Sequence, residues 1–113
     1  MKTKVREVGN IAILEVKGKI MMGEGDVQIR DEVKKLIAQG KKNILVDLGE
    51  VTMIDSSGLG ELVGSFTSVT RQGGKMKLLK LAKRVHDLLQ ITRLYTVFEV
   101  FDDEAKAVKS FEA

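Results

Sequence analysis

The fold of this chain is decided by the stretch Val51-Thr52-Met53-Ile54-Asp55-Ser56-Ser57-Gly58-Leu59-Gly60. It follows an apolar run at residues 44–48 and precedes a segment whose apolar residues recur at helical spacing. Asp55, Ser56 and Ser57 therefore stand where a strand gives way to a helix. A helix start presents unpaired backbone N–H groups and partial positive charge, so a phosphate on a serine is well placed there. The stretch predicts a strand–turn–helix unit with a candidate phosphorylation site in its turn.

Strand and helix patterns alternate along the rest of the chain. The short Gly9-Asn10 connection favours an antiparallel hairpin at the start, and residues 18–25 are expected to form a loop. We expect Asp26 and Asp102 to cap the helices that follow them. Alternation implies right-handed crossovers, so the predicted fold is α/β, a mixed, largely parallel five-stranded sheet with an N-terminal hairpin and about four helices. The expected strands are 5–8, 11–16, 44–48, 75–79 and 96–100, and the expected helices are 27–39, 57–71, 83–91 and 103–111.

Length and composition indicate a globular protein rather than a membrane or disordered one. The 113 residues fit one domain, taken as 1–113. Apolar residues make up 43% and charged residues of both signs 31%, a profile typical of a globular protein. The sequence has neither a signal-peptide pattern nor an apolar run long enough to span a bilayer. We therefore expect a cytoplasmic protein without a membrane partner.

The inventory of reactive side chains argues against an enzyme. The chain contains no cysteine and one histidine, His86, which excludes thiolate and multi-histidine metal sites within one chain. A nucleophile at Ser57 would need His86 as its base, and nothing in the spacing brings the two together. The Gly-x-Ser-x-Gly and P-loop patterns are both missing. The sequence predicts a binding protein without a catalytic site, a metal or a cofactor.

A stripe of small and polar residues runs along the helix that begins near Ser57. Ser57, Glu61, Gly64 and Ser68 follow at helical spacing opposite the apolar side, with Gly60 beside them. A glycine inside a helix costs about 1 kcal/mol relative to alanine. Two explanations stay open: this small-residue stripe is a partner-docking surface, or the glycines fit a tight contact with the sheet or with a neighbouring helix.

The ordinary role of serine and aspartate at a helix start is to cap the helix and shape the turn. From local chemistry alone, capping is the commoner role for Ser56 and Ser57, although one serine can cap while the other accepts phosphate. A phosphate would add about −1.5 to −2 charge, and the helix dipole would favour it by ~0.3–1 kcal/mol. We therefore expect phosphorylation to leave the fold intact and to act on binding.

The motif Asp55-Ser56-Ser57-Gly58-Leu59-Gly60, in this order of elements, resembles that of the STAS domain, specifically of bacterial anti-sigma factor antagonists. The resemblance covers essentially the whole chain, because the strand at 44–48 and Gly73-Gly74 also fall where that family has them. In that family the unphosphorylated antagonist binds an anti-sigma factor that is also a serine kinase of the histidine-kinase-like ATPase type, and a sigma factor is released. The kinase phosphorylates the second serine of the motif, the antagonist dissociates, and a metal-dependent serine phosphatase restores it.

The resemblance implies that Ser57 is the phosphoacceptor and that Asp55, Ser56, Gly58 and Gly60 shape the turn. The hypothesis of a docking stripe places the partner-binding surface at Glu61, Gly64 and Ser68, with Glu24 nearby.

The sequence departs from the family in the loop after the second strand. Many relatives carry Gly-Glu-Leu-Asp there, where this chain has Gly18-Lys19-Ile20-Met21 and so lacks both acids. Glu24 is expected to supply charge nearby. The methionines of this loop, Met21 and Met22, are either adaptable contacts or buried filler, and buried filler is the expected role.

Two other functions remain open. One is a STAS scaffold that is not phosphorylated and packs into a larger signalling assembly. The other is a nucleic-acid-binding domain that uses residues 71–93, where seven lysines and arginines accompany one acid, Asp87. No aromatic residue lies between Phe66 and Tyr95, which argues against stacking of single-stranded bases. Nucleic acid is therefore the less expected partner.

Overall fold

The computed structural model describes residues 1–112. Its strands form one sheet, in which they are arranged in the order of the sequence. Strand β1 pairs antiparallel with β2, and the remaining neighbours pair in parallel. The predicted fold class, a mixed and largely parallel five-stranded sheet that opens with a hairpin, is confirmed. The strands are β1 (Lys2–Val8), β2 (Ile11–Ile20), β3 (Asn43–Ile54), β4 (Lys75–Leu81) and β5 (Val100–Phe101).

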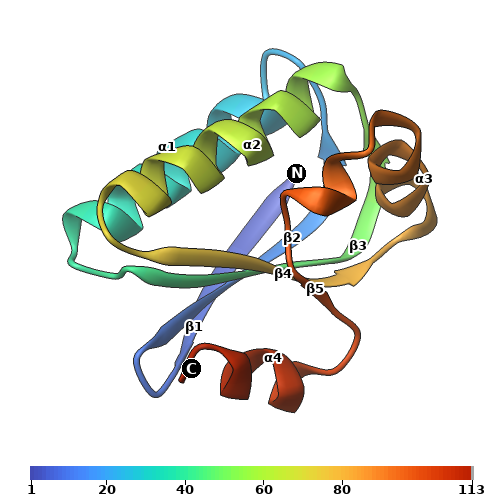
Figure 1. Cartoon of the computed structure of the whole chain (residues 1–113). Coiled ribbons are helices and arrows are strands. Elements are labelled where there is room, and N and C mark those ends of the chain that lie inside the picture. The colour runs from blue at the N-terminus through green and yellow to red at the C-terminus, as the bar shows by residue number, and fades with distance from the viewer. Residues whose placement is uncertain (113) are drawn as a thin grey trace.

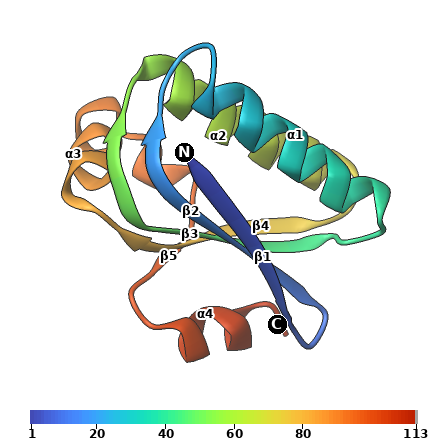
Figure 2. The same cartoon turned by 180° about the vertical axis from the view of Figure 1, so that it is seen from behind.

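Helices cover both faces of the sheet unequally (Figure 1). Three helices, α1 (Gly25–Ala38), α2 (Ser56–Arg71) and α3 (Lys83–Thr92), lie on one face, and α4 (Glu104–Ser110) lies on the other. Figure 2, seen from behind, shows α1 and α2 running side by side. A short 3-10 helix at Leu94–Thr96 lies in the connection between α3 and β5. No helix within residues 1–112 is both long and apolar enough to cross a membrane.

Two apolar cores follow from the alternation of side chains along each strand. On β2, Ala12 and Leu14 point into the large core under α1, α2 and α3, whereas Ile11 and Ile13 point into a smaller core under α4. Phe111 closes the smaller core from the end of α4. The long helices therefore cover one side, and α4 covers part of the other.

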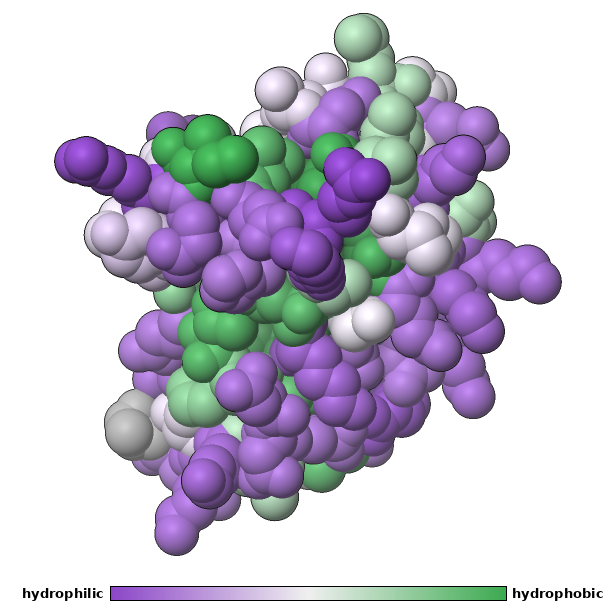
Figure 3. All heavy atoms as spheres, turned by 90° about the vertical axis from the view of Figure 1, so that its right-hand side faces the viewer, coloured by the Kyte–Doolittle hydropathy of each residue, from purple (hydrophilic) through white to green (hydrophobic). Residues whose placement is uncertain are grey.

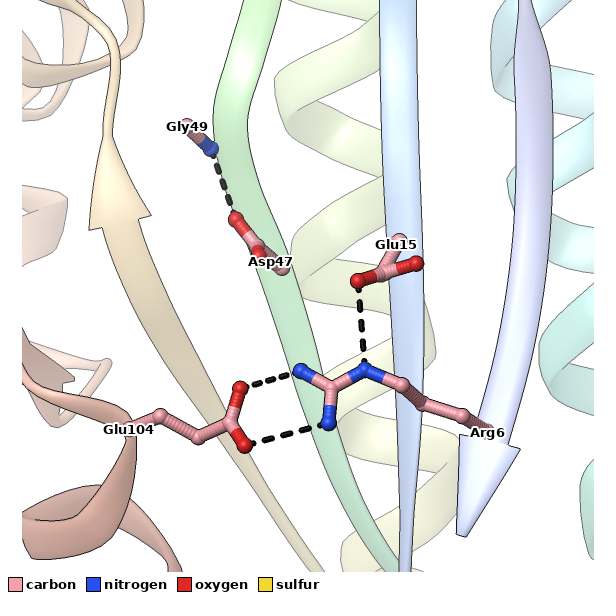
Figure 4. A network of polar contacts seen from close by, with 5 residues as sticks. All are labelled: Arg6, Glu15, Asp47, Gly49 and Glu104. Carbon is pink, nitrogen blue, oxygen red and sulfur yellow. Dashed lines mark hydrogen bonds and ion pairs between the residues drawn. The ribbon is translucent and has the colours of Figure 1, made fainter.

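Charged side chains fasten α4 to the sheet. The ammonium of Lys77, a residue only 8% exposed, donates to the Ser110 carbonyl at 3.0 Å and lies 4.8 Å from the centre of the Phe111 ring. At the other end of α4, the Arg6 guanidinium donates to both oxygens of Glu104 and, at 3.2 Å, to Glu15 (Figure 4). The ion pair with Arg6 lowers the pKa of the Glu104 carboxyl. These contacts hold α4 over the smaller core.

The predicted strands at 11–16 and 44–48 are correct in place but too short. β2 continues to Ile20 and β3 to Ile54, so the predicted loop at 18–25 shrinks to residues 21–24. The added lengths pair with each other, as in Lys17 opposite Glu50, with irregular register near Gly18. Their polar residues interrupt the apolar pattern, although the backbone remains in the ladder.

Three other local predictions are wrong. The last strand is not 96–100, because Thr96 lies in the 3-10 helix and β5 covers only Val100–Phe101. Asp102 does not cap α4, since Asp103 accepts the Lys106 N–H at 3.0 Å instead. Asp26 does not cap α1, because the helix begins at Gly25 and Asp26 lies in its first turn.

Candidate functional site

Asp55, not a serine, caps α2, the helix that begins inside the stretch at 51–60. Its extended backbone ends β3, and its Oδ1 accepts the Gly58 N–H at 2.8 Å. Ser56 and Ser57 are the first two residues of α2. Within residues 1–112 neither serine hydroxyl has a hydrogen bond to the protein, so the capping alternative for these two side chains is wrong. Both hydroxyls remain available for other chemistry.

The second oxygen of the same carboxylate holds a distant loop. Asp55 Oδ2 accepts the Met22 N–H at 2.9 Å, across 33 residues of sequence. The N–H groups of Met22 and then Gly58 lower the pKa of the Asp55 carboxyl, which is therefore ionised at neutral pH. One side chain thus joins the start of α2 to the connection between β2 and α1.

Gly58 belongs to the turn for a steric reason. A Cβ at Gly58 would lie 2.1 Å from the carbonyl oxygen of Ile20, at the end of β2. Gly25, at the start of α1, meets the same strand end, since a Cβ there would lie 2.5 Å from the Lys19 carbonyl oxygen. The two helix starts therefore crowd against the end of β2, and this places the turn at 55–58 beside the loop at 21–24.

The turn is open to the outside. Ser56 is exposed and Ser57 is half-buried. The Ser57 side chain is thus neither sealed in the core nor fully free in solvent.

Residues 21–24 form an ordered loop, which we call the Met22 loop. Met21 O accepts the N–H of Asp26 at 3.2 Å, and Asp26 Oδ1 accepts the Gly23 N–H at 2.9 Å. The Met22 residue is 72% exposed, and Glu24 is exposed beside it. The prediction of Met22 as buried filler is wrong, because the loop is shorter than expected and its tip points outward.

The small-residue stripe lies on the outer side of α2. Gly64 and Ser68 are exposed, and Glu61 is half-buried. A Cβ at Gly60 or at Gly64 would find no atom outside the helix within 4 Å. The alternative that these glycines fit a tight contact with the sheet or with a neighbouring helix is therefore wrong.

Charged residues of α1 border this stripe, and the sequence pattern gave no sign of them. Partial burial raises the pKa of the Glu61 carboxyl, while the nearby charges of Arg30 and Lys34 on α1 act in the opposite direction. The packing of α1 beside α2 on the same face of the sheet was not evident from either helix alone. Plotting the polar faces of α1 and α2 on helical wheels would have suggested that the two helices lie side by side.

The basic segment at 71–93 does not form a single cationic surface. Lys77 is buried under α4, and Lys83 pairs with Asp87 at 3.1 Å. Figure 3 shows that apolar surface breaks through the polar covering on the side where α3 lies, and Ile91 in that helix is 80% exposed. This mixture does not favour a nucleic-acid interface.

Neither catalysis nor metal binding finds support in the described part of the chain. His86 Nδ1 lies 3.5 Å from Asp87 Oδ1 on α3, and its polar contact is with that neighbour rather than with Ser57. Residues 1–112 contain no group of three histidine, aspartate or glutamate side chains arranged to hold a metal ion.

Comparison with known proteins extends this picture. The STAS domain profile matches residues 2–107. The anti-sigma-B factor antagonist of Bacillus subtilis is 37% identical over 82 residues, which cover 69% of this chain and 74% of that protein. The anti-sigma F factor antagonist of Paenibacillus polymyxa is 30% identical over 71 residues, which cover 63% of this chain and 61% of that protein.

Solved structures show the same fold. The anti-sigma factor antagonist SpoIIAA in its unphosphorylated form superposes with a TM-score of 0.73 at 18% identity, over 99% of both chains. The Bacillus cell fate determinant SpoIIAA in its phosphorylated form superposes with a TM-score of 0.74 at 20% identity, over 96% of this chain and 98% of that chain. Since the profile covers nearly all of the sheet and helices described above, this chain belongs to the STAS domain family.

Proposed function

We propose that this protein is an anti-sigma factor antagonist whose binding to an anti-sigma serine kinase is switched by phosphorylation of Ser57. In the unphosphorylated state it binds the kinase, of the histidine-kinase-like ATPase type, and a sigma factor is released. The names of its relatives support the antagonist role. The existence of phosphorylated and unphosphorylated structures of SpoIIAA, which has the same fold, supports the switch.

The observation that carries the proposal is the state of Ser57. Its hydroxyl makes no hydrogen bond to residues 1–112, it is half-buried at the start of α2, and it begins the small-residue stripe. A kinase can reach such a hydroxyl without unfolding the domain. Glu61, Gly64 and Ser68 along α2, with Glu24 from the Met22 loop, form the proposed contact surface.

The chemical step is transfer of the γ-phosphoryl group of ATP. A bond forms between Ser57 Oγ and the γ-phosphorus, the bond to the β,γ-bridging oxygen breaks, ADP departs, and the serine proton is lost to a base of the kinase. A metal-dependent serine phosphatase reverses the result by hydrolysis. The antagonist itself supplies only the hydroxyl and its position.

Phosphorylation acts on the interface through charge. It brings about −1.5 to −2 charge into a surface that the partner covers. A buried polar group left unpaired costs ~1–3 kcal/mol and a charge costs more, while each ~1.4 kcal/mol is tenfold in affinity. A loss of affinity of at least tenfold follows unless the partner offers a cation.

Binding of Ser57→Ala and Ser57→Asp to the cognate kinase tests the proposal. Both variants are expected to fold, and only the aspartate form is expected to lose the kinase, as measured by calorimetry. Ser56→Asp is the matched control, because it adds the same charge one residue away on an exposed side chain. Equal kinase binding by Ser57→Ala and Ser57→Asp contradicts the switch.

Mass spectrometry after incubation with the kinase and ATP separates the switch from a scaffold role. A single phosphate on Ser57 is expected. The loss of both acids at Gly18-Lys19-Ile20-Met21 is the feature that favours the alternative, a STAS scaffold that is not phosphorylated. Kinase binding without any phosphate transfer would favour that alternative.

A further inference from the structure

We infer that Asp55 is a positioning residue that presents Met22 as an apolar anchor to the partner, and that phosphate on Ser57 withdraws this anchor by displacing the Asp55 carboxylate from the N–H groups at the start of α2. The inference rests on the proposed function, because it names how the modification of Ser57 is read. It assigns to the Met22 loop a contact that the small-residue stripe alone does not provide.

The first step is the order of the Met22 loop. The N–H groups of Met22, Gly23 and Glu24 all have acceptors, which are Asp55 Oδ2 at 2.9 Å, Asp26 Oδ1 at 2.9 Å and Met21 O at 3.5 Å. A loop held in this way still leaves Met22 72% exposed. A fixed backbone that displays a large apolar side chain loses little entropy on binding, and the flexible thioether adapts to the recess that receives it.

The second step is the position of the loop relative to Ser57. One carboxylate accepts both the Met22 N–H, at 2.9 Å, and the Gly58 N–H, at 2.8 Å, so a single side chain bridges the loop and the start of α2. A partner that covers Ser57 therefore also meets Met22. The exposed acid Glu24 follows directly in the loop. By charge complementarity, the occupant is the antagonist's kinase partner, carrying an apolar recess for Met22 and a cation that faces Glu24.

The third step is the competition that phosphate introduces. An acceptor already occupies the helix start, because the Asp55 carboxylate accepts the Gly58 N–H at 2.8 Å. Phosphate oxygens seek the same amides at a helix start. Two anions cannot share these donors without strong repulsion. The phosphate displaces the carboxylate, and the Met22 N–H then loses its acceptor.

Backbone amide exchange tests the displacement without any kinase. Phosphoserine is incorporated at position 57 during synthesis of the full chain, and exchange is followed by NMR. The Met22 amide is expected to exchange at least tenfold faster than in the unmodified protein. The Gly23 amide, which Asp26 holds, is expected to keep its rate and serves as the internal control. An unchanged Met22 rate in the phosphorylated chain overturns the inference.

Two sets of variants test the anchor. Asp55→Asn keeps one acceptor oxygen and loses the other, so it is expected to speed Met22 exchange and weaken kinase binding at least tenfold while Ser57 remains unmodified. Asp103→Asn is the matched control, because Asp103 caps α4 on the opposite face and holds no loop. Met22→Ala is expected to weaken binding at least tenfold, and Met22→Leu is expected to retain it.

The outcomes separate the two proposals. If Ser57→Asp loses the kinase while Met22→Ala keeps it, the switch stands and the anchor is wrong. If Ser57→Asp keeps the kinase, the proposed function fails, whatever the Met22 amide shows. If Asp55→Asn binds as well as Asp103→Asn, Asp55 does not position the anchor.

Discussion

Replacing Gly64 by alanine should make this protein more stable. Gly64 lies in the interior of α2, it is exposed, and an added Cβ finds no atom outside the helix within 4 Å. The substitution therefore neither gains nor loses a packing contact. What remains is the difference in helix propensity, ~0.8–1.0 kcal/mol in favour of alanine. For a domain of this size this corresponds to a rise in Tm of roughly 4 °C.

The measurement is equilibrium unfolding in urea of the wild type and Gly64→Ala, fitted with a common slope. Gly60→Ala is expected to give a similar gain, because its surroundings are equally open. A decrease in the free energy of unfolding for Gly64→Ala would show that the glycine has a role within the fold. That result would remove the reason to assign the residue to partner binding. Gly64→Arg completes the test, with an intact fold and lost kinase binding expected.

Three further outcomes follow from other contacts. Gly58→Ala, in the same helix, should destabilise or prevent folding, since its Cβ would lie 2.1 Å from a carbonyl oxygen, and circular dichroism with urea titration measures the difference from Gly64→Ala. Glu104→Gln should lose of order 0.2–1 kcal/mol at neutral pH, as for a surface ion pair. The pKa of the Glu104 carboxyl is lowered in the folded state, so the ion pair stabilises the fold above the unfolded-state pKa near 4.3, and this stabilisation is lost as the pH falls through the folded-state pKa. Urea titrations at pH 7 and pH 3 should therefore show the stabilities of the variant and the wild type converging in acid. Lys77→Met should cost ~1–3 kcal/mol, because the Ser110 carbonyl loses its donor, and limited proteolysis should then cut α4 first.

The sequence predicted the elements that carry strong periodicity. The apolar run at 44–48 and the helical spacing after Leu59 each correspond to an element of the expected type, because those side chains are buried on defined faces. The ends of the elements were harder to place. Thr52 and Lys17 look like loop residues, yet both lie in strands whose second halves face solvent on one side.

The site was predicted in its sequence-local part only. The turn at 55–58 follows from four adjacent residues, and its aspartate is a common cap. The hydrogen bond from the Met22 N–H to Asp55 joins segments 33 residues apart. Its donor is a backbone N–H, which almost every residue carries, so the sequence does not mark Met22 as the partner. For the same reason, the open surroundings of Gly60 and Gly64 became evident only when the neighbouring elements were in place.

The strand order has a consequence for how the chain assembles during translation. Each strand of the series β1-β2-β3-β4-β5 pairs with the strand made just before it, so a nascent chain can build the sheet from one edge as it leaves the ribosome. The last helix, α4, reaches back to the first strand, where Arg6 meets Glu104 across 98 residues. Ile13 and Leu45 in the smaller core stay uncovered until α4 has been synthesised. A stalled chain that ends before Glu104 would therefore present an apolar sheet face to chaperones.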